Sequence, residues 1–250
     1  MTTPATPLAA ARAAFERGDH ETVVRLVTAL LDARPGDDAA HELRARSELA
    51  LGRTAEAERD AEDAVRLDPD EIRYRELLAQ VLAAAGAHHD AATEYRRLAR
   101  NDPRQRDWAL AEAGERLNAA EGDEAVDAAR RAVRLDRGDA SAQLALATAL
   151  VRTGDAAGAM AAAAAAQQLA PGDLHVRETA ADARWLAGDS GGAFLEFSEL
   201  AKRLSGSARD RVVEKARRLY RSRAGSGGRL VAGWPWLFRL ALRNGWLHIR

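Results

Sequence analysis

The feature that most constrains the fold is a period of 34 residues, counted from residue 4. An alanine stands at the eighth position of six successive periods, and a second small residue stands at the twentieth. The first set is Ala11, Ala45, Ala79, Ala113, Ala147 and Ala181, and the second is Val23, Ala57, Ala91, Ala125, Ala159 and Ala193. Small residues at two fixed phases favour a repeated unit in which two segments approach each other closely.

Each period predicts a helical hairpin. A glycine at the fifteenth position can take the left-handed conformation that ends a first helix, and an aspartate such as Asp19, Asp155 or Asp189 then suits the N-cap of a second helix. The glycines are Gly18, Gly52, Gly86, Gly154 and Gly188, with Ala120 in the fourth period. Prolines end the second helix because proline cannot continue it, and they are Pro35, Pro69, Pro103 and Pro171.

The fourth period departs from this pattern. Its Gly122-Asp123 pair comes two residues late, so we expect a longer first helix and a tighter turn there. One hairpin cannot bury its own apolar face, so the units must stack on one another. The 47% hydrophobic content is sufficient for such a core.

These residues resemble the tetratricopeptide repeat family, in the small residues at phases 8 and 20, the Gly-Asp at 15–16 and the proline at 32. The family's tyrosine at phase 11 is replaced, for example by Glu48 and Arg184. The resemblance covers residues 4–207 as six units, which are 4–37, 38–71, 72–105, 106–139, 140–173 and 174–207. It implies an all-α, right-handed α-solenoid whose concave groove, lined by first helices, holds a peptide or helix of another protein. The expected function is therefore that of a non-catalytic scaffold or adaptor.

The resemblance also implies which side chains face the groove, because certain first-helix positions commonly do so in this family. The polar ones in the first three units are Arg12, Glu42, Arg46, Arg73, Glu76 and Gln80. Leu144 and Trp185 suggest a more apolar floor further along, which suits the apolar anchors of a partner helix. The alternative is that the polar residues are ordinary solvated charges on a helix face.

The C-terminal part of the chain differs in charge from the repeats. Residues 202–250 hold 13 basic and two acidic side chains, a net charge of +11, whereas the other residues carry −12. We expect a capping helix over 208–223, with an apolar side and an arginine-rich side, and a flexible linker over 224–228. A basic, tryptophan-rich amphipathic tail then follows over 229–250.

The sequence leaves four binding partners of this tail open. The tail could dock on its own chain or a second copy, bind another protein, lie on a membrane surface as a peripheral tether, or contact nucleic acid. Nucleic acid is disfavoured because the acidic repeats would repel phosphates. The residues expected to make the contact are Trp234, Trp236, Phe238, Arg239, Arg243 and Trp246.

No residue pattern predicts catalysis. The string Gly188-Asp-Ser-Gly-Gly192 resembles the nucleophile loop of chymotrypsin-like proteases, but it falls at an inter-helix turn of the repeat. His88 and His89 occupy the equivalent turn of the third unit, and without cysteine or a further histidine nearby they do not predict a metal site. We therefore expect no enzymatic activity, no cofactor and no metal.

The N-terminus lacks a secretory signal, and no stretch reaches the length of a spanning segment. A cytoplasmic protein is expected, peripheral at the membrane if the tail binds there. The large excess of arginine over lysine, together with abundant alanine, is typical of a bacterial protein from a GC-rich genome.

Overall fold

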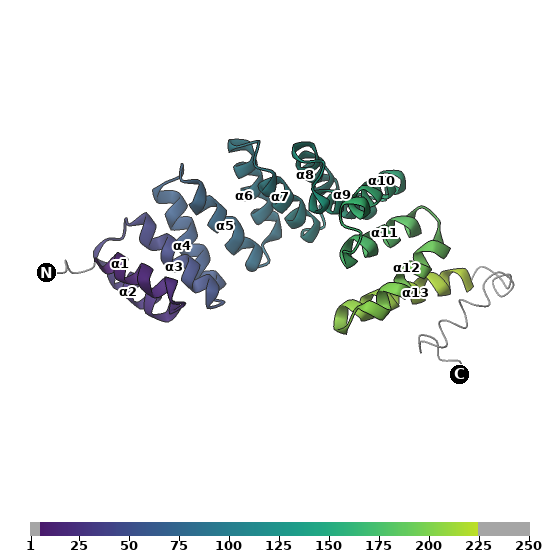
Figure 1. The fold of residues 1–250 in the computed structure, drawn as a ribbon. Coiled ribbons are helices and arrows are strands. Elements are labelled where there is room, and N and C mark those ends of the chain that lie inside the picture. Colours follow the sequence, from purple (N-terminus) through teal and green to yellow (C-terminus); the bar gives the residue numbers. More distant parts are fainter. Residues whose placement is uncertain (1–5, 225–250) are drawn as a thin grey trace. The chain divides into compact units, whose positions relative to one another are not determined.

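The computed structural model describes residues 6–224, and over this part of the chain the secondary structure consists of thirteen helices without a strand (Figure 1). The predicted tail, including all six tail residues named above, lies outside the described residues. The helices are α1 (Pro7–Glu16), α2 (His20–Ala33), α3 (Asp38–Ala50), α4 (Thr54–Leu67), α5 (Ile72–Ala84), α6 (His88–Asn101), α7 (Arg106–Asn118), α8 (Gly122–Leu135), α9 (Ala140–Thr153), α10 (Ala156–Leu169), α11 (Leu174–Leu186), α12 (Ser190–Arg203) and α13 (Gly206–Ala224).

The chain divides into two compact units, residues 1–135 with α1 to α8 and residues 136–250 with α9 to α13. In each unit, every helix packs against the next one in the chain. Three pairs of neighbouring first helices also touch, α1 with α3, α3 with α5, and α9 with α11. This chain-order packing confirms the predicted all-α array of helical hairpins within each unit.

The second helices follow the period without deviation. They begin at His20, Thr54, His88, Gly122, Ala156 and Ser190, and each start is 34 residues after the one before it. All six are 14 residues long. The small residues at phases 8 and 20 are all completely buried, from Ala11 and Val23 in the first hairpin to Ala181 and Ala193 in the sixth. Their size lets the paired helices approach, as the sequence predicted.

The predicted turn chemistry is present at the ends of the first helices. Gly18, Gly52, Gly86, Gly154 and Gly188 have φ angles between 75° and 87°, in the left-handed region. The side chains of Asp19, Asp155 and Asp189 accept the N–H groups of Thr22, Gly158 and Gly192 at 3.2, 2.9 and 2.8 Å. Gly188–Gly192, the segment that resembles a protease loop, is therefore the turn and first residues of α12.

The expectation of a longer first helix in the fourth hairpin is wrong. Helix α7 has 13 residues, as α3, α5 and α11 do, and α8 begins in register at Gly122. Ala120 itself adopts the left-handed conformation, with φ of 61°, and takes the place of the turn glycine. The Glu121 N–H then donates to the Arg116 carbonyl at 2.8 Å, which closes the turn as Arg53 and Glu48 do in the second hairpin, also at 2.8 Å.

The predicted capping helix is present as α13, which begins two residues earlier than expected. Val212, Val213, Ala216 and Leu219 are buried and pack in one cluster with Phe194, Phe197 and Leu200 of α12. The opposite side carries exposed arginines such as Arg218 and Arg221. Among residues 6–224, no helix is long and apolar enough to cross a membrane.

The turn at Ala120 generates a pair of opposite predictions. Ala120→Gly should raise the free energy of unfolding by about 0.5–1 kcal/mol, because glycine relieves the left-handed strain. Gly86→Ala, the matched change at the same phase, should lower it by a similar amount, since an added Cβ meets no atom within 4 Å and only the φ of +80° opposes it. Urea unfolding followed by circular dichroism measures both. Shifts of the same sign in the two variants would contradict the assignment of strain to φ.

Candidate partner-binding face and its supporting network

The charged residues predicted for the groove form a ladder between two first helices of residues 1–135. On α3, Arg46 Nε lies 3.0 Å from Glu42, and Arg73 of α5 lies 4.0 Å from the other oxygen of the same carboxylate. Glu42 is 13% exposed, whereas Arg46 and Arg73 are 42% and 51% exposed. The half-buried carboxylate thus accepts a hydrogen bond from Arg46 and forms a longer ion pair with Arg73, and both arginines are partly exposed to solvent. We call Glu42, Arg46 and Arg73 the charged ladder.

Tyr74 fixes the position of Arg73. Its hydroxyl donates to Asp38 at 2.9 Å, which joins α5 to α3, and the Arg73 guanidinium lies 5.1 Å from the Tyr74 ring centroid. Burial and the Asp38 hydrogen bond raise the pKa of Tyr74 to about 12. The phenol therefore keeps its proton and this donor role over the whole neutral range.

The other predicted groove residues have more varied surroundings. Arg12 on α1 and Gln80 on α5 are exposed, and Glu76 is half-buried. In the second unit Leu144 is half-buried on α9, and Trp185 packs on the cluster formed by α11, α12 and α13. Trp185 therefore contributes to the core of that unit as well as to its surface.

The capping helix is attached to α11 by ion pairs. Arg211 donates to both carboxylate oxygens of Glu178, at 3.0 and 2.9 Å, and Lys215 reaches Glu178 at 2.8 Å and Asp182 at 2.5 Å. Burial alone would raise the pKa of Glu178, but the hydrogen bonds from Arg211 and Lys215 outweigh burial and hold the pKa below its ordinary value. At Asp182 burial dominates and raises the pKa.

A recurring polar contact was not predicted from the sequence. The fourth residue of a unit pairs with the twenty-third, so that a first helix is joined to its own second helix. His41 meets Asp60 at 2.9 Å, Arg75 meets Glu94 at 2.9 Å, and Arg177 meets Glu196 at 2.5 Å. We call these pairs the hairpin clasps.

The clasp position also holds the preceding unit. His41 Nε2 lies 3.1 Å from the Pro35 carbonyl, Arg75 donates to the Pro69 carbonyl at 3.3 Å, and Gln143 donates to the Arg137 carbonyl at 3.3 Å. In each case the carbonyl is six residues earlier, in the loop that ends the previous second helix. One side chain thereby satisfies a loop carbonyl that the helix cannot reach.

The two adjacent histidines make similar links between hairpins. His88 Nδ1 lies 2.7 Å from Glu115 of α7, and His89 Nδ1 lies 2.5 Å from Glu121 in the following turn. Both histidines are the first residues of α6. Each is directed to a different carboxylate of the next hairpin, as expected for structural histidines.

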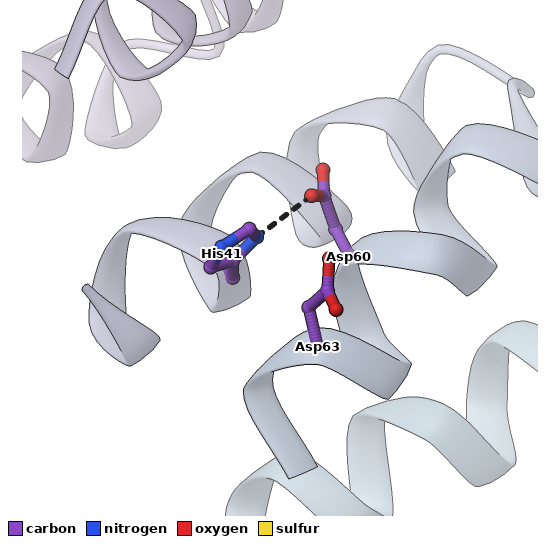
Figure 2. Close-up of side chains that lie close together, drawn as sticks. All are labelled: His41, Asp60 and Asp63. Atoms are coloured by element: carbon purple, nitrogen blue, oxygen red, sulfur yellow. Dashed lines mark hydrogen bonds and ion pairs between the residues drawn. The ribbon is translucent and has the colours of Figure 1, made fainter. Parts of the chain in front are cut away.

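The clasp at His41 belongs to a larger cluster with metal-ligand chemistry. Figure 2 shows His41 of α3 directed at Asp60 of α4, with Asp63 one turn further along α4. Ligand atoms of these three residues lie within 4.8 Å of one another. However, Arg44 donates to both oxygens of Asp60, at 2.6 and 2.7 Å, and both ring nitrogens of His41 face oxygen atoms. A cation would have to approach beside a guanidinium, so the cluster fits a closed charge network better than a metal centre.

Glu48 completes this network from α3. Its side chain is buried, at 6% exposed for the residue, and its Oε2 atom lacks a hydrogen-bond partner among the described residues. Burial, followed by the negative charge of Asp60, raises the pKa of Glu48 to about 7. The sequence shows that Glu48 stands at phase 11, where the family has a tyrosine. It does not show that Asp60 of α4 interacts with this glutamate.

Comparison with known proteins places this arrangement in a class of proteins built from stacked helical hairpins. A sequence model of the tetratricopeptide repeat matches residues 8–72, 43–106 and 109–173. The chain belongs to the tetratricopeptide repeat family. The sequence matches no curated protein.

Several solved structures share the fold at low sequence identity. A tetratricopeptide repeat protein from Parabacteroides merdae ATCC 43184 is 14% identical, with a TM-score of 0.69 over 94% of this chain and 97% of that one. MamA from Desulfovibrio magneticus RS-1 is 16% identical, with a TM-score of 0.60 over 66% of this chain and 93% of that one. YrrB, described as having an unusual peptide-binding site, is 15% identical, with a TM-score of 0.59 over 76% of this chain and 97% of that one. At these identities the likeness concerns the fold alone.

The attachment of α13 generates a prediction with a pH dependence. Glu178→Gln should lower the free energy of unfolding at pH 7 by about 1–3 kcal/mol, because three charge-assisted hydrogen bonds, two from Arg211 and one from Lys215, lose their anion. The folded-state pKa of Glu178 is lowered, so its contribution is present above the ordinary value of 4.5 and is lost as the pH falls through the lower folded-state pKa. The difference between wild type and variant should therefore shrink in acid.

Thermal unfolding from pH 3 to 7 measures this effect. Glu199→Gln is the matched control, since the Glu199–Lys202 pair is about half-exposed on α12 and should contribute under about 0.5 kcal/mol. An equal effect of the two substitutions would show that α13 is not held by Glu178.

Proposed function

We propose that the chain is a non-catalytic interaction scaffold that binds a peptide or helix of another protein along its first helices. The observation that carries the proposal is the charged ladder, because arginines already paired within the protein, Arg46 with Glu42 and Arg73 with Glu71 and Tyr74, lose little side-chain freedom when they bind. Membership of a repeat family whose fold serves protein interactions supports the same function. The peptide-binding site described for YrrB is consistent with it.

The location of the ladder supports binding across more than one repeat. Arg46 belongs to α3 and Arg73 to α5, so a bound segment that contacts both would cross two hairpins. Their half-exposed guanidinium groups are suited to carboxylate or carbonyl oxygens of a partner. Within the second unit, Leu144 and Trp185 are the candidates for apolar contacts with a partner.

The ladder proposal predicts a selective loss of binding. Arg46→Glu combined with Arg73→Glu should remove bound partners, because both positions reverse charge while the carboxylate between them stays. The control combines Arg59→Glu on α4 with Arg100→Glu on α6, which makes the same change in net charge on exposed second-helix residues. Affinity capture from an extract of the source organism with quantitative mass spectrometry measures the difference. Equal partner profiles for the two variants would reject the ladder as the binding surface.

A second candidate function is that of a peripheral membrane tether. The charge division favours it, because residues 202–250 carry a net charge of +11 and include three tryptophans. Basic residues near an anionic leaflet contribute about 1 kcal/mol each, and tryptophans favour the interface. In this function the C-terminal segment would hold the protein at the membrane while the repeats recruit cargo.

Vesicle sedimentation tests the tether. The full chain should sediment with vesicles of phosphatidylserine and phosphatidylcholine at low salt, and the bound fraction should fall as salt screens the charges. Arg239→Glu combined with Arg243→Glu should release it, whereas Arg59→Glu combined with Arg100→Glu should not. Protein that stays in the supernatant at low salt would remove the tether from consideration.

A further inference from the structure

Two carboxyl groups are buried side by side in the second hairpin. Glu48 of α3 is 6% exposed and Asp60 of α4 is 3% exposed, and their side chains interact directly. Arg44 makes both of its short contacts with Asp60, which leaves the Oε2 atom of Glu48 without a hydrogen-bond partner among the described residues. The hairpin therefore provides one guanidinium for two buried acids.

The charges around this pair come from three helices. From α3, His41 faces Asp60, and Arg44 binds Asp60 while its charge also acts on Glu48. From α4, Glu56 adds a further negative charge that acts on Glu48. From α2, the Thr28 hydroxyl accepts from Arg44 at 3.1 Å, and the charge of Asp32 acts on Arg44. Helix α5 adds the apolar side chains Leu77, Leu78, Val81 and Leu82 to this core, and its charged contacts with α3, through Arg73 and Tyr74, go to Glu42 and Asp38.

We propose that the hairpin of α3 and α4 is a pH-responsive element, in which ionisation of Glu48 beside Asp60 loosens the packing of α3 on α4. A protonated Glu48 is a neutral group that can donate to Asp60. An ionised Glu48 places a second negative charge in a buried site that holds a single arginine, and an unpaired buried charge is strongly destabilising.

The direction of the effect follows from the two carboxyl groups. The pKa of Glu48 is raised from 4.5 to about 7, so the stability that its proton provides is fully present below about pH 4.5 and is lost as the pH rises through 7. The pKa of Asp60 is lowered, because the hydrogen bonds from Arg44 and His41 outweigh its burial, so Asp60 stays ionised over this window. The hairpin should therefore be tightest in mild acid and loosest in mild alkali.

The location gives this change a consequence for the surface. Helix α3 carries Glu48 on its buried side and Glu42 and Arg46 of the charged ladder on its partly exposed side. A looser α3 would change the distance between Arg46 and Arg73 of α5. The pH response itself does not depend on the proposed function, and it is tested without a partner.

Amide hydrogen exchange of the full chain, analysed as protection factors between pH 5.5 and 8.5, tests the proposal. Protection over residues 38–67 should fall about 30-fold in the wild type between these two pH values, as a pKa rise from 4.5 to about 7 allows. Glu48→Gln, which mimics the protonated form, should keep its protection at pH 8.5. Glu62→Gln, an exposed glutamate of the same hairpin, should behave as the wild type does. Equal losses in the wild type and Glu48→Gln would overturn the proposal.

A direct titration covers the case in which Glu48→Gln fails to fold. The side-chain carboxyl carbon of Glu48, assigned by through-bond NMR in the wild-type chain, should titrate with a midpoint near pH 7. A midpoint near 4.5 would overturn the proposal, whatever the variant does.

Discussion

Close approach of paired helices at buried small residues is the constraint on which the rest of the structure depends. Ala45 and Ala57 in one hairpin, and their equivalents in the others, are completely buried. Their small side chains bring the two helices near enough for charged groups on facing sides to meet. The hairpin clasps, the links to loop carbonyls and the buried pair of Glu48 with Asp60 all need this spacing. The small apolar residues thus determine which polar and charged side chains of the two helices can meet.

The repeat register could be predicted from sequence because it rests on residues whose role is conformational. Glycine at Gly86 and aspartate at Asp155 act within their own turn, so their effect is local. The error in the fourth hairpin arose because the turn was identified by its glycine. At Ala120 the surrounding helices impose the left-handed conformation on an alanine. An alanine in the sequence does not indicate such a conformation, so this tertiary effect could not be predicted.

The polar contacts were harder to predict, because they join residues on different helices. One signal was present in the chain itself, since a basic residue at position 4 of the repeat and an acid at position 23 occur in the same units. His41 and Arg75 face the acids Asp60 and Glu94, whereas Ala109 in the fourth unit corresponds to Ala128. The charged ladder follows the phases expected of this family, but its internal ion pairs through Glu42 required coordinates. The role of the C-terminal tail stays a prediction.

The chain-order packing of the helices has a consequence for how the protein is made. Nearly every tertiary contact in the described part of the chain lies within a hairpin or between successive hairpins, so residues in contact are close in sequence. Such low contact order favours fast folding, because little chain must be ordered before contacts form. Within each unit, a hairpin can pack against the one already formed as soon as it leaves the ribosome. The 34-residue period is therefore also the step in which the nascent chain can gain stable structure.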